Sequence, residues 1–90
     1  MANDLRNLEK ILKALANKRR LAILEYLKSN KEASVGEIAR VINLSIKATS
    51  KHLNILSSLD ILERNQIGPQ MFYYLASGQK QITKHLLSLL

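Results

Sequence analysis

Apolar residues recur every three to four positions along most of the chain, which is the spacing of one face of an α-helix. In the first segment Leu5, Leu8 and Leu12 follow this period, and similar spacing returns further along the chain. Polar connections separate the periodic segments. The pattern predicts five helices, at about residues 4–16, 18–28, 35–42, 45–58 and 79–90.

Capping residues mark where three of these helices begin. Asn17 and Ser45 stand directly before the second and fourth helices, where a short polar side chain accepts a hydrogen bond from a free backbone N–H group. Ser34 and Glu37 match the capping box, in which each side chain bonds the other residue's N–H group. We expect the third helix to end at Asn43, which leaves only a tight turn before the fourth. Two short helices joined in this way indicate a helix-turn-helix.

The period changes after the fourth helix. Residues 61–65 and 71–75 are short runs typical of strands, and residues 66–70 between them contain a Gly-Pro pair, so this part predicts a β-hairpin. A hairpin that directly follows a helix-turn-helix is the wing of a winged-helix domain. The expected fold is therefore mainly α, a winged helix-turn-helix with a β-hairpin wing, in a single domain over residues 1–90.

Charge adds a candidate partner. Fourteen Lys and Arg against seven Asp and Glu give the chain a formal net charge of +7, which attracts polyanions. A basic surface that only meets solvent is the alternative. The excess is concentrated, because no acidic residue occurs between Glu37 and Asp60 while Arg40, Lys47 and Lys51 lie in that stretch. This distribution favours nucleic acid as the partner.

Composition also argues against several classes of protein. The chain has no cysteine, so disulfides and thiolate metal sites are excluded. His85 has no companion ligand in the following turns, so we expect no metal site and no cofactor. Paired carboxylates and a glycine-rich phosphate loop are missing, which speaks against an enzyme. The start of the chain lacks the features of a signal peptide and no apolar run is long enough to span a bilayer, so a cytoplasmic protein without a membrane partner is expected.

The fourth helix is expected to carry the binding chemistry. At about 100° per residue, Thr49, Leu53 and Leu56 form its core side. Hydroxyl, amide and ammonium groups share the opposite arc and can donate to phosphate oxygens and to base edges in a major groove. The expected DNA-binding residues of this helix are Ser45, Lys47, Ser50, Lys51 and Asn54. A solvated polar face is the alternative, but the second position of a helix-turn-helix favours DNA contact.

Four other side chains complete the candidate interface. His52 lies between the core side and the exposed arc of the fourth helix, where it is expected to pack in part while one ring nitrogen reaches DNA. In the hairpin, Arg64 is the one basic residue, and Gln66 and Gln70 flank the tip. We expect these three to touch the sugar-phosphate backbone more weakly than the helix does, because the tip has no charge.

The first and last helices carry more apolar surface than so small a chain is expected to hide by itself. A second copy of the chain is the expected cover. The predicted dimer interface consists of Leu5, Leu8, Leu12, Ile82, Leu86 and Leu89.

Several motifs together resemble the ArsR-type repressors. The segment 14–24 looks like the opening of that family's second helix, Leu44-Ser45 with Ser50-Lys51-His52-Leu53 resembles its recognition helix, and Arg64, Gly68 and Tyr73-Tyr74-Leu75 look like its wing. The resemblance covers about residues 10–75. It implies a homodimer, held by its first and last helices, that binds a partly palindromic operator and represses transcription.

Because the sequence departs from the family pattern at some positions, not every property of the family is expected of this chain. Familiar members sense metals through cysteines before the turn or through carboxylate and histidine pairs in the last helix. Such residues are not present in segment 35–40 or around His85. Metal or thiol sensing is therefore not carried over, and the sequence does not identify a small-molecule effector. Asp60 stands where the family usually has a glycine, and Ile46 where a polar residue is common.

The leading hypothesis is a homodimeric regulator that binds specific double-stranded DNA with the helix at about residues 45–58 in the major groove. The alternative is a winged-helix module that binds protein, or an architectural protein that coats DNA without sequence preference, because one fold serves many functions.

Overall fold

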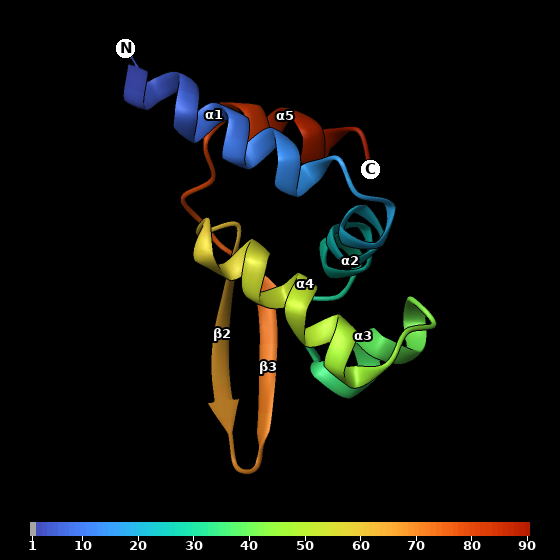
Figure 1. The fold of residues 1–90 in the computed structure, drawn as a ribbon. Coiled ribbons are helices and arrows are strands. Elements are labelled where there is room, and N and C mark those ends of the chain that lie inside the picture. Colours follow the sequence, from blue (N-terminus) through green and yellow to red (C-terminus); the bar gives the residue numbers. More distant parts are fainter. Residues whose placement is uncertain (1) are drawn as a thin grey trace.

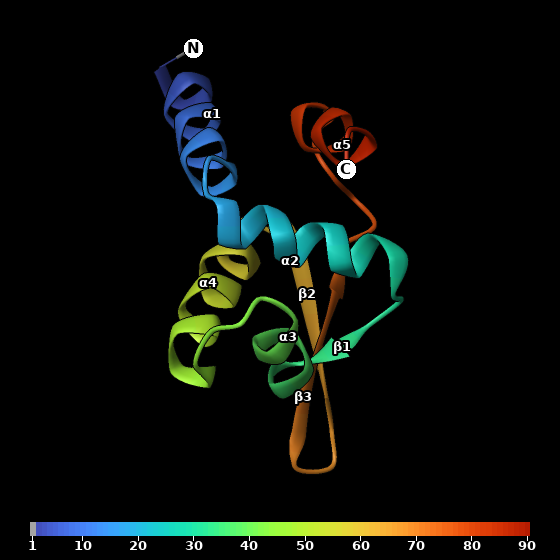
Figure 2. The same cartoon turned by 90° about the vertical axis from the view of Figure 1, so that its right-hand side faces the viewer.

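The computed structural model describes the backbone of residues 2–90 and the side chains of residues 4–90. Five helices and a three-stranded sheet make up this described part. Figure 1 and Figure 2 show them from two directions at right angles. In chain order they are α1 (Ala2–Leu15), α2 (Lys18–Ser29), β1 (Ala33–Ser34), α3 (Val35–Val41), α4 (Ile46–Ser58), β2 (Leu62–Ile67), β3 (Gln70–Leu75) and α5 (Gln81–Ser88). All five expected helices are present, with α5 shorter at both ends than residues 79–90.

The elements divide between two ends of an elongated body of 42 × 24 × 23 Å. Both views place α1 and α5 at one end and the tip of the β2–β3 hairpin at the other, with α2 between (Figures 1 and 2). The two helices α3 and α4 lie on the hairpin side of α2. The wing tip, which is part of the expected DNA-binding surface, therefore lies at the end opposite the two helices expected to bind a second copy.

Predicted caps begin the helices. Asn17 Oδ1 accepts from the N–H of Arg20 at 3.1 Å, and Ser45 Oγ accepts from the N–H of Ala48 at 3.1 Å. Ser34 Oγ accepts from the N–H of Glu37 at 3.2 Å, as the capping box predicts. The carboxylate of Glu37, which was expected to bond back to the backbone of Ser34, accepts a hydrogen bond from the Tyr26 hydroxyl. That bond links α2 to α3.

Two left-handed residues end the helices of the helix-turn-helix. Asn43 has φ 54° after α3, and Asp60 has φ 59° after α4. After each, a backbone N–H bonds five residues back, from Leu44 to the Ala39 carbonyl at 2.9 Å and from Ile61 to the Leu56 carbonyl at 3.0 Å. This is the Schellman motif that glycine usually completes. Asparagine and aspartate serve here because their short polar side chains tolerate this conformation.

The sheet has the order β1–β3–β2, with both pairs antiparallel. Its strands are longer than residues 61–65 and 71–75, because pairing continues to Ile67 and Gln70. Only Gly68 and Pro69 remain as the turn, in place of the expected residues 66–70, and Gly68 supplies the positive φ of 62°. The two-residue strand β1, which pairs with Tyr73 and Phe72 of β3, was not predicted.

One apolar core joins all these elements. It takes the inner faces of α1, α2, α3 and α4, Ala33 of β1, the start of β2 and one side of β3. Its largest fully buried apolar residues are Ile23, Leu24, Ile38, Leu53, Leu56, Ile61 and Leu62. Because α4 presents Leu53 and Leu56 to this core, its opposite face is turned to solvent. The core therefore determines which side of α4 is available for binding.

Thr49 is a polar residue in this core. It is fully buried, and its hydroxyl has no hydrogen-bond partner. We expect Thr49→Val, which has nearly the same shape, to stabilise the protein by about 1 kcal/mol because no buried hydroxyl is left unsatisfied. A gain of this size raises the melting temperature by about 4–8 °C. Thr49→Ser keeps the hydroxyl and loses a buried methyl, so it should lower the melting temperature. A valine variant less stable than wild type would contradict the expectation.

Candidate nucleic-acid interface

The face of α4 opposite the core is polar and open to solvent. Thr49, Leu53 and Leu56 are buried, as the helical period predicted. Lys47, Lys51 and Asn54 are exposed, and Ser50 is half-buried. Ser45 is exposed at the N-terminal end of the helix while it caps the first turn. Each of the five polar residues expected to contact DNA thus has at least part of its surface exposed to solvent.

Arg19 holds the turn between α3 and α4 in place. Its Nη1 donates to the carbonyl of Ile42 at 2.6 Å and to that of Asn43 at 3.1 Å. These carbonyls lie just past the end of α3, where backbone acceptors lack helical partners. Charge-assisted bonds of this kind are among the stronger hydrogen bonds in proteins. The guanidinium on α2 therefore positions α4 relative to α3.

Arg20 connects α1 to α4 through three bonds. Its Nε donates to the carbonyl of Ala14 at 2.6 Å, its Nη2 donates to that of Lys13 at 3.4 Å, and its Nη1 lies 3.1 Å from Nδ1 of His52. A guanidinium only donates, so Nδ1 must accept, and the neutral ring then carries its proton on Nε2. His52 therefore has one nitrogen bound within the protein and one N–H left to donate. Its half-buried position agrees with the expectation for this residue.

The surroundings of His52 disfavour its protonated form. Burial, then the positive charges of Arg20 and Arg19, lower the pKa of His52 below its ordinary value of 6.5. As the pH drops below 6.5, His52 takes up a proton in the unfolded chain but stays neutral in the folded chain. The free energy of unfolding therefore decreases as the pH is lowered, until the pH reaches the pKa of His52 in the folded chain. His52→Asn keeps an acceptor near the position of Nδ1 but cannot be protonated. We therefore expect its melting temperature to drop less than that of wild type when the pH is lowered from 7.5 to 5.5.

The other histidine provides the control. His85 is exposed on α5, so His85→Asn changes the histidine count without touching the Arg20 bond. We expect its loss of melting temperature over this pH range to match that of wild type. An equal loss in all three proteins would show that His52 does not contribute to the pH dependence.

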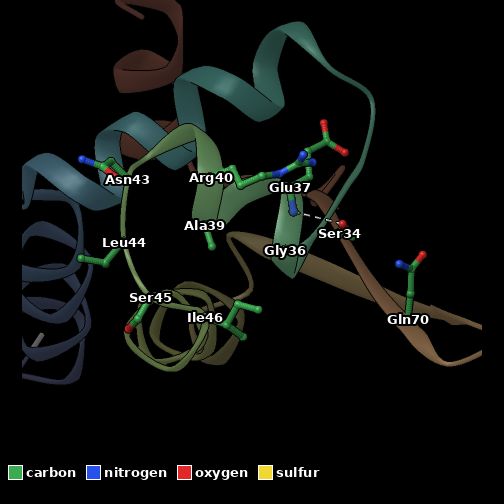
Figure 3. Close-up of a pocket in the computed structure, with 10 residues that line it drawn as sticks. All are labelled: Ser34, Gly36, Glu37, Ala39, Arg40, Asn43, Leu44, Ser45, Ile46 and Gln70. Carbon is green, nitrogen blue, oxygen red and sulfur yellow. Dashed lines mark hydrogen bonds between the residues drawn. The ribbon is translucent and has the colours of Figure 1, made fainter.

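A cleft of about 960 Å³ opens beside the N-terminal end of α4. Figure 3 shows its walls coming from α3, from the turn and from the wing. Its lining residues include Gly36, Arg40, Ser45, Ile46 and Gln70. Sequence reasoning named only Ser45 and Gln70 among these as contacts. Arg40 was visible as part of the acid-free stretch, but nothing in the pattern placed it at the same cleft as Ser45.

The wing offers three exposed polar side chains. Arg64 and Gln66 extend from β2 and Gln70 begins β3, so all three belong to strands. Tyr73 of β3 is buried, whereas Tyr74 is half-buried. A hydrogen bond to the Glu63 carboxylate raises the pKa of Tyr74 above its ordinary value of 10.0. Because Glu63 adds a negative charge next to Arg64, the wing is less positive than α4.

Apolar side chains are exposed at the opposite end. Leu5 is 70% exposed and Leu89 72%, and Leu8, Leu12 and Ile82 are also exposed. Leu86 differs, since it is half-buried and packs against the core of its own chain. Five residues therefore carry the exposed apolar surface expected for a dimer interface. We call them the α1–α5 patch, and they are Leu5, Leu8, Leu12, Ile82 and Leu89. None of the helices in the described part is long and apolar enough to cross a membrane.

Comparison with known proteins places the chain in a family. The model of a helix-turn-helix domain family matches residues 15–65, which include α3 and α4. Transcriptional activator HlyU of Vibrio cholerae is 39% identical over 77 residues, covering 86% of this chain and 70% of that protein. The cadmium resistance transcriptional regulatory protein CadC of Listeria innocua is 33% identical over 63 residues, and 70% of this chain matches about half (53%) of its length.

Solved structures agree with the sequence relatives. The structure of reduced HlyU from Vibrio cholerae superimposes with a TM-score of 0.81 at 34% identity, over 99% of this chain and 90% of that one. A homodimeric winged helix-turn-helix DNA-binding domain from Mycobacterium bovis, from a possible ArsR-family regulator, gives 0.82 at 31% identity, over 98% and 78%. The chain belongs to the ArsR-type winged helix-turn-helix transcriptional regulators, which are DNA-binding proteins. The resemblance noted in the sequence and the expected fold are thereby confirmed.

Proposed function

We propose that this protein is cytoplasmic, binds specific operator sequences in double-stranded DNA as a homodimer, and represses transcription. The exposed polar face of α4 supports this proposal most directly. Its ammonium, hydroxyl and amide groups are turned away from the core and have no carboxylate among them. An α-helix fits the major groove of B-form DNA, where such donors can reach base edges. Repression requires only that the dimer occupies the operator.

In this proposal α4 enters the major groove and the wing follows the neighbouring backbone. Lys47 and Lys51 neutralise phosphates, while Ser50 and Asn54 reach base edges. Ser45 and the N–H groups of the first turn of α4 hold a phosphate. Further contacts come from the free Nε2–H of His52 and from the wing side chains Arg64, Gln66 and Gln70.

Selection of bound duplexes from a random library tests the proposal. A sequence-specific homodimer should enrich a motif with two related half-sites, because operator symmetry mirrors protein symmetry. It should bind that motif about a thousandfold or more tighter than random duplex. Transcription in vitro from a promoter that overlaps the motif should fall as protein is added.

Two other results would contradict the proposal. Tight binding without an enriched motif and with a steep dependence on salt would indicate an architectural protein that coats DNA. Absence of any binding to duplex would favour a winged-helix module that binds protein. In either case the face of α4 would need another explanation.

A further inference from the structure

The recognition helix begins with an apolar side chain that its own protein does not cover. Ile46 is the first residue of α4, directly after the capping Ser45, and it is 61% exposed. At about 100° per residue it lies between the core side, marked by Thr49 and Leu53, and the polar face, one turn before Ser50. An isoleucine in this position adds little to the stability of the fold, because most of its surface remains in water.

The surroundings of Ile46 are polar and leave room for a ligand. In Figure 3 its side chain lies at the cleft, between Ser45 on one side and Gly36 and Gln70 on the other. Arg40 also lines this cleft of about 960 Å³. A Cβ atom built on Gly36 would meet nothing within 4 Å, so the opposite wall is open as well. The lining carries one cation, Arg40, one carboxylate, Glu37, and several hydrogen-bonding groups beside Ile46, so a ligand that fits it is polar with an isolated apolar group.

The major groove of DNA has this composition. Each base pair presents donors and acceptors there, and thymine alone adds an apolar group, the methyl at C5. Isoleucine has no donor or acceptor and cannot read guanine, adenine or cytosine by hydrogen bonds. Contact with the thymine methyl is the favourable interaction that remains open to it.

We propose that Ile46 is a specificity-determining residue that contacts the C5-methyl group of a thymine in each half-site of the operator. This inference rests on the proposed function, because it requires α4 to lie in the major groove with its N-terminal turn inward. The polar neighbours then hold the backbone and the flanking bases, and Ile46 distinguishes thymine from the other three bases at one position.

Duplexes in which single thymines are replaced by deoxyuridine test the inference. Deoxyuridine keeps the base pair and all hydrogen-bonding groups and removes only the methyl. The probe is the motif recovered by selection from a random library, and the measurement is its dissociation constant by fluorescence anisotropy. One replacement at the Ile46 position should weaken wild-type binding about fourfold, and replacement in both half-sites about fifteenfold.

Three variants separate this contact from a general effect on the helix. Ile46→Ala should bind the thymine operator as weakly as wild type binds the deoxyuridine operator, and should respond little to the replacement. Ile46→Val keeps a branched apolar group and should retain most of the preference. Ile55→Ala, a matched truncation of another exposed isoleucine of α4, should respond like wild type. Melting temperatures of all variants confirm that they are folded.

The outcomes are distinct. If selection recovers no motif, the proposed function and this inference both fail. If a motif is recovered but wild type binds it equally with and without each thymine methyl, only the inference fails. A methyl effect of the same size in wild type and in Ile46→Ala would also overturn it, since another residue would then make the contact.

Discussion

Replacing Lys47 and Lys51 together by alanine is expected to weaken operator binding about a hundredfold or more at moderate salt. Both side chains are exposed on α4, so their loss should leave the fold intact. A charge-assisted hydrogen bond contributes about 1.5–3 kcal/mol, and a homodimer with both substitutions loses four ammonium groups. Dissociation constants measured by fluorescence anisotropy over a range of salt concentrations test this expectation.

The dependence on salt identifies the cause of that loss. Each phosphate neutralised by a lysine contributes about 0.9 to the slope of log K against log salt. The double variant should therefore have a slope shallower by about 3–4. Lys31→Ala with Lys84→Ala removes the same charge from exposed positions away from α4 and should change the slope much less. Equal affinities for wild type and the α4 variant at all salt concentrations would mean that α4 does not contact DNA.

Features with a local cause could be predicted from the sequence. Helical spacing places Leu53 and Leu56 inside and Lys47 and Lys51 outside without knowledge of any other element. The cap at Ser45 depends on residues within one turn. The helix-turn-helix and its polar face follow from these local rules, which is why the fold and the candidate face of α4 agreed with expectation.

Features built by contacts between distant segments could not be predicted in this way. Strand β1 has two residues and no period of its own, and it exists because β3 offers it hydrogen bonds. Arg19 and Arg20 appeared only as part of a family motif. The structure shows that both donate to backbone carbonyls, and that Arg20 also reaches His52, 32 residues away. No spacing rule relates side chains so far apart in the chain.

These long-range bonds relate the two ends of the molecule. Arg20 binds the carbonyls at the end of α1 and the imidazole on α4 at the same time. Arg20 thus links α1, which carries Leu5 and Leu8 of the α1–α5 patch, to α4, which carries the candidate DNA-binding face.

Substituting lysine for Leu5 and Leu89 is expected to convert the protein to a monomer and to weaken operator binding about 10²–10⁴-fold. These are the two most exposed members of the α1–α5 patch, at 70% and 72%, so the fold of the single chain should tolerate the change. Two lysines would bring unpaired charges into an apolar interface, which is costly. One chain has one α4, so without a partner the protein engages one half-site and loses the gain from binding two at once.

The choice of lysine makes the result decisive, because added positive charge by itself strengthens attraction to DNA. A loss of affinity then has to come from loss of the dimer. Ser29→Lys with Ser77→Lys adds the same charge at exposed positions outside the patch and should leave a dimer with wild-type affinity or better. Multi-angle light scattering gives the mass of each protein, and fluorescence anisotropy gives its affinity. A patch variant that remains dimeric would place the interface elsewhere, and a monomer with wild-type affinity would show that operator binding does not need a second copy.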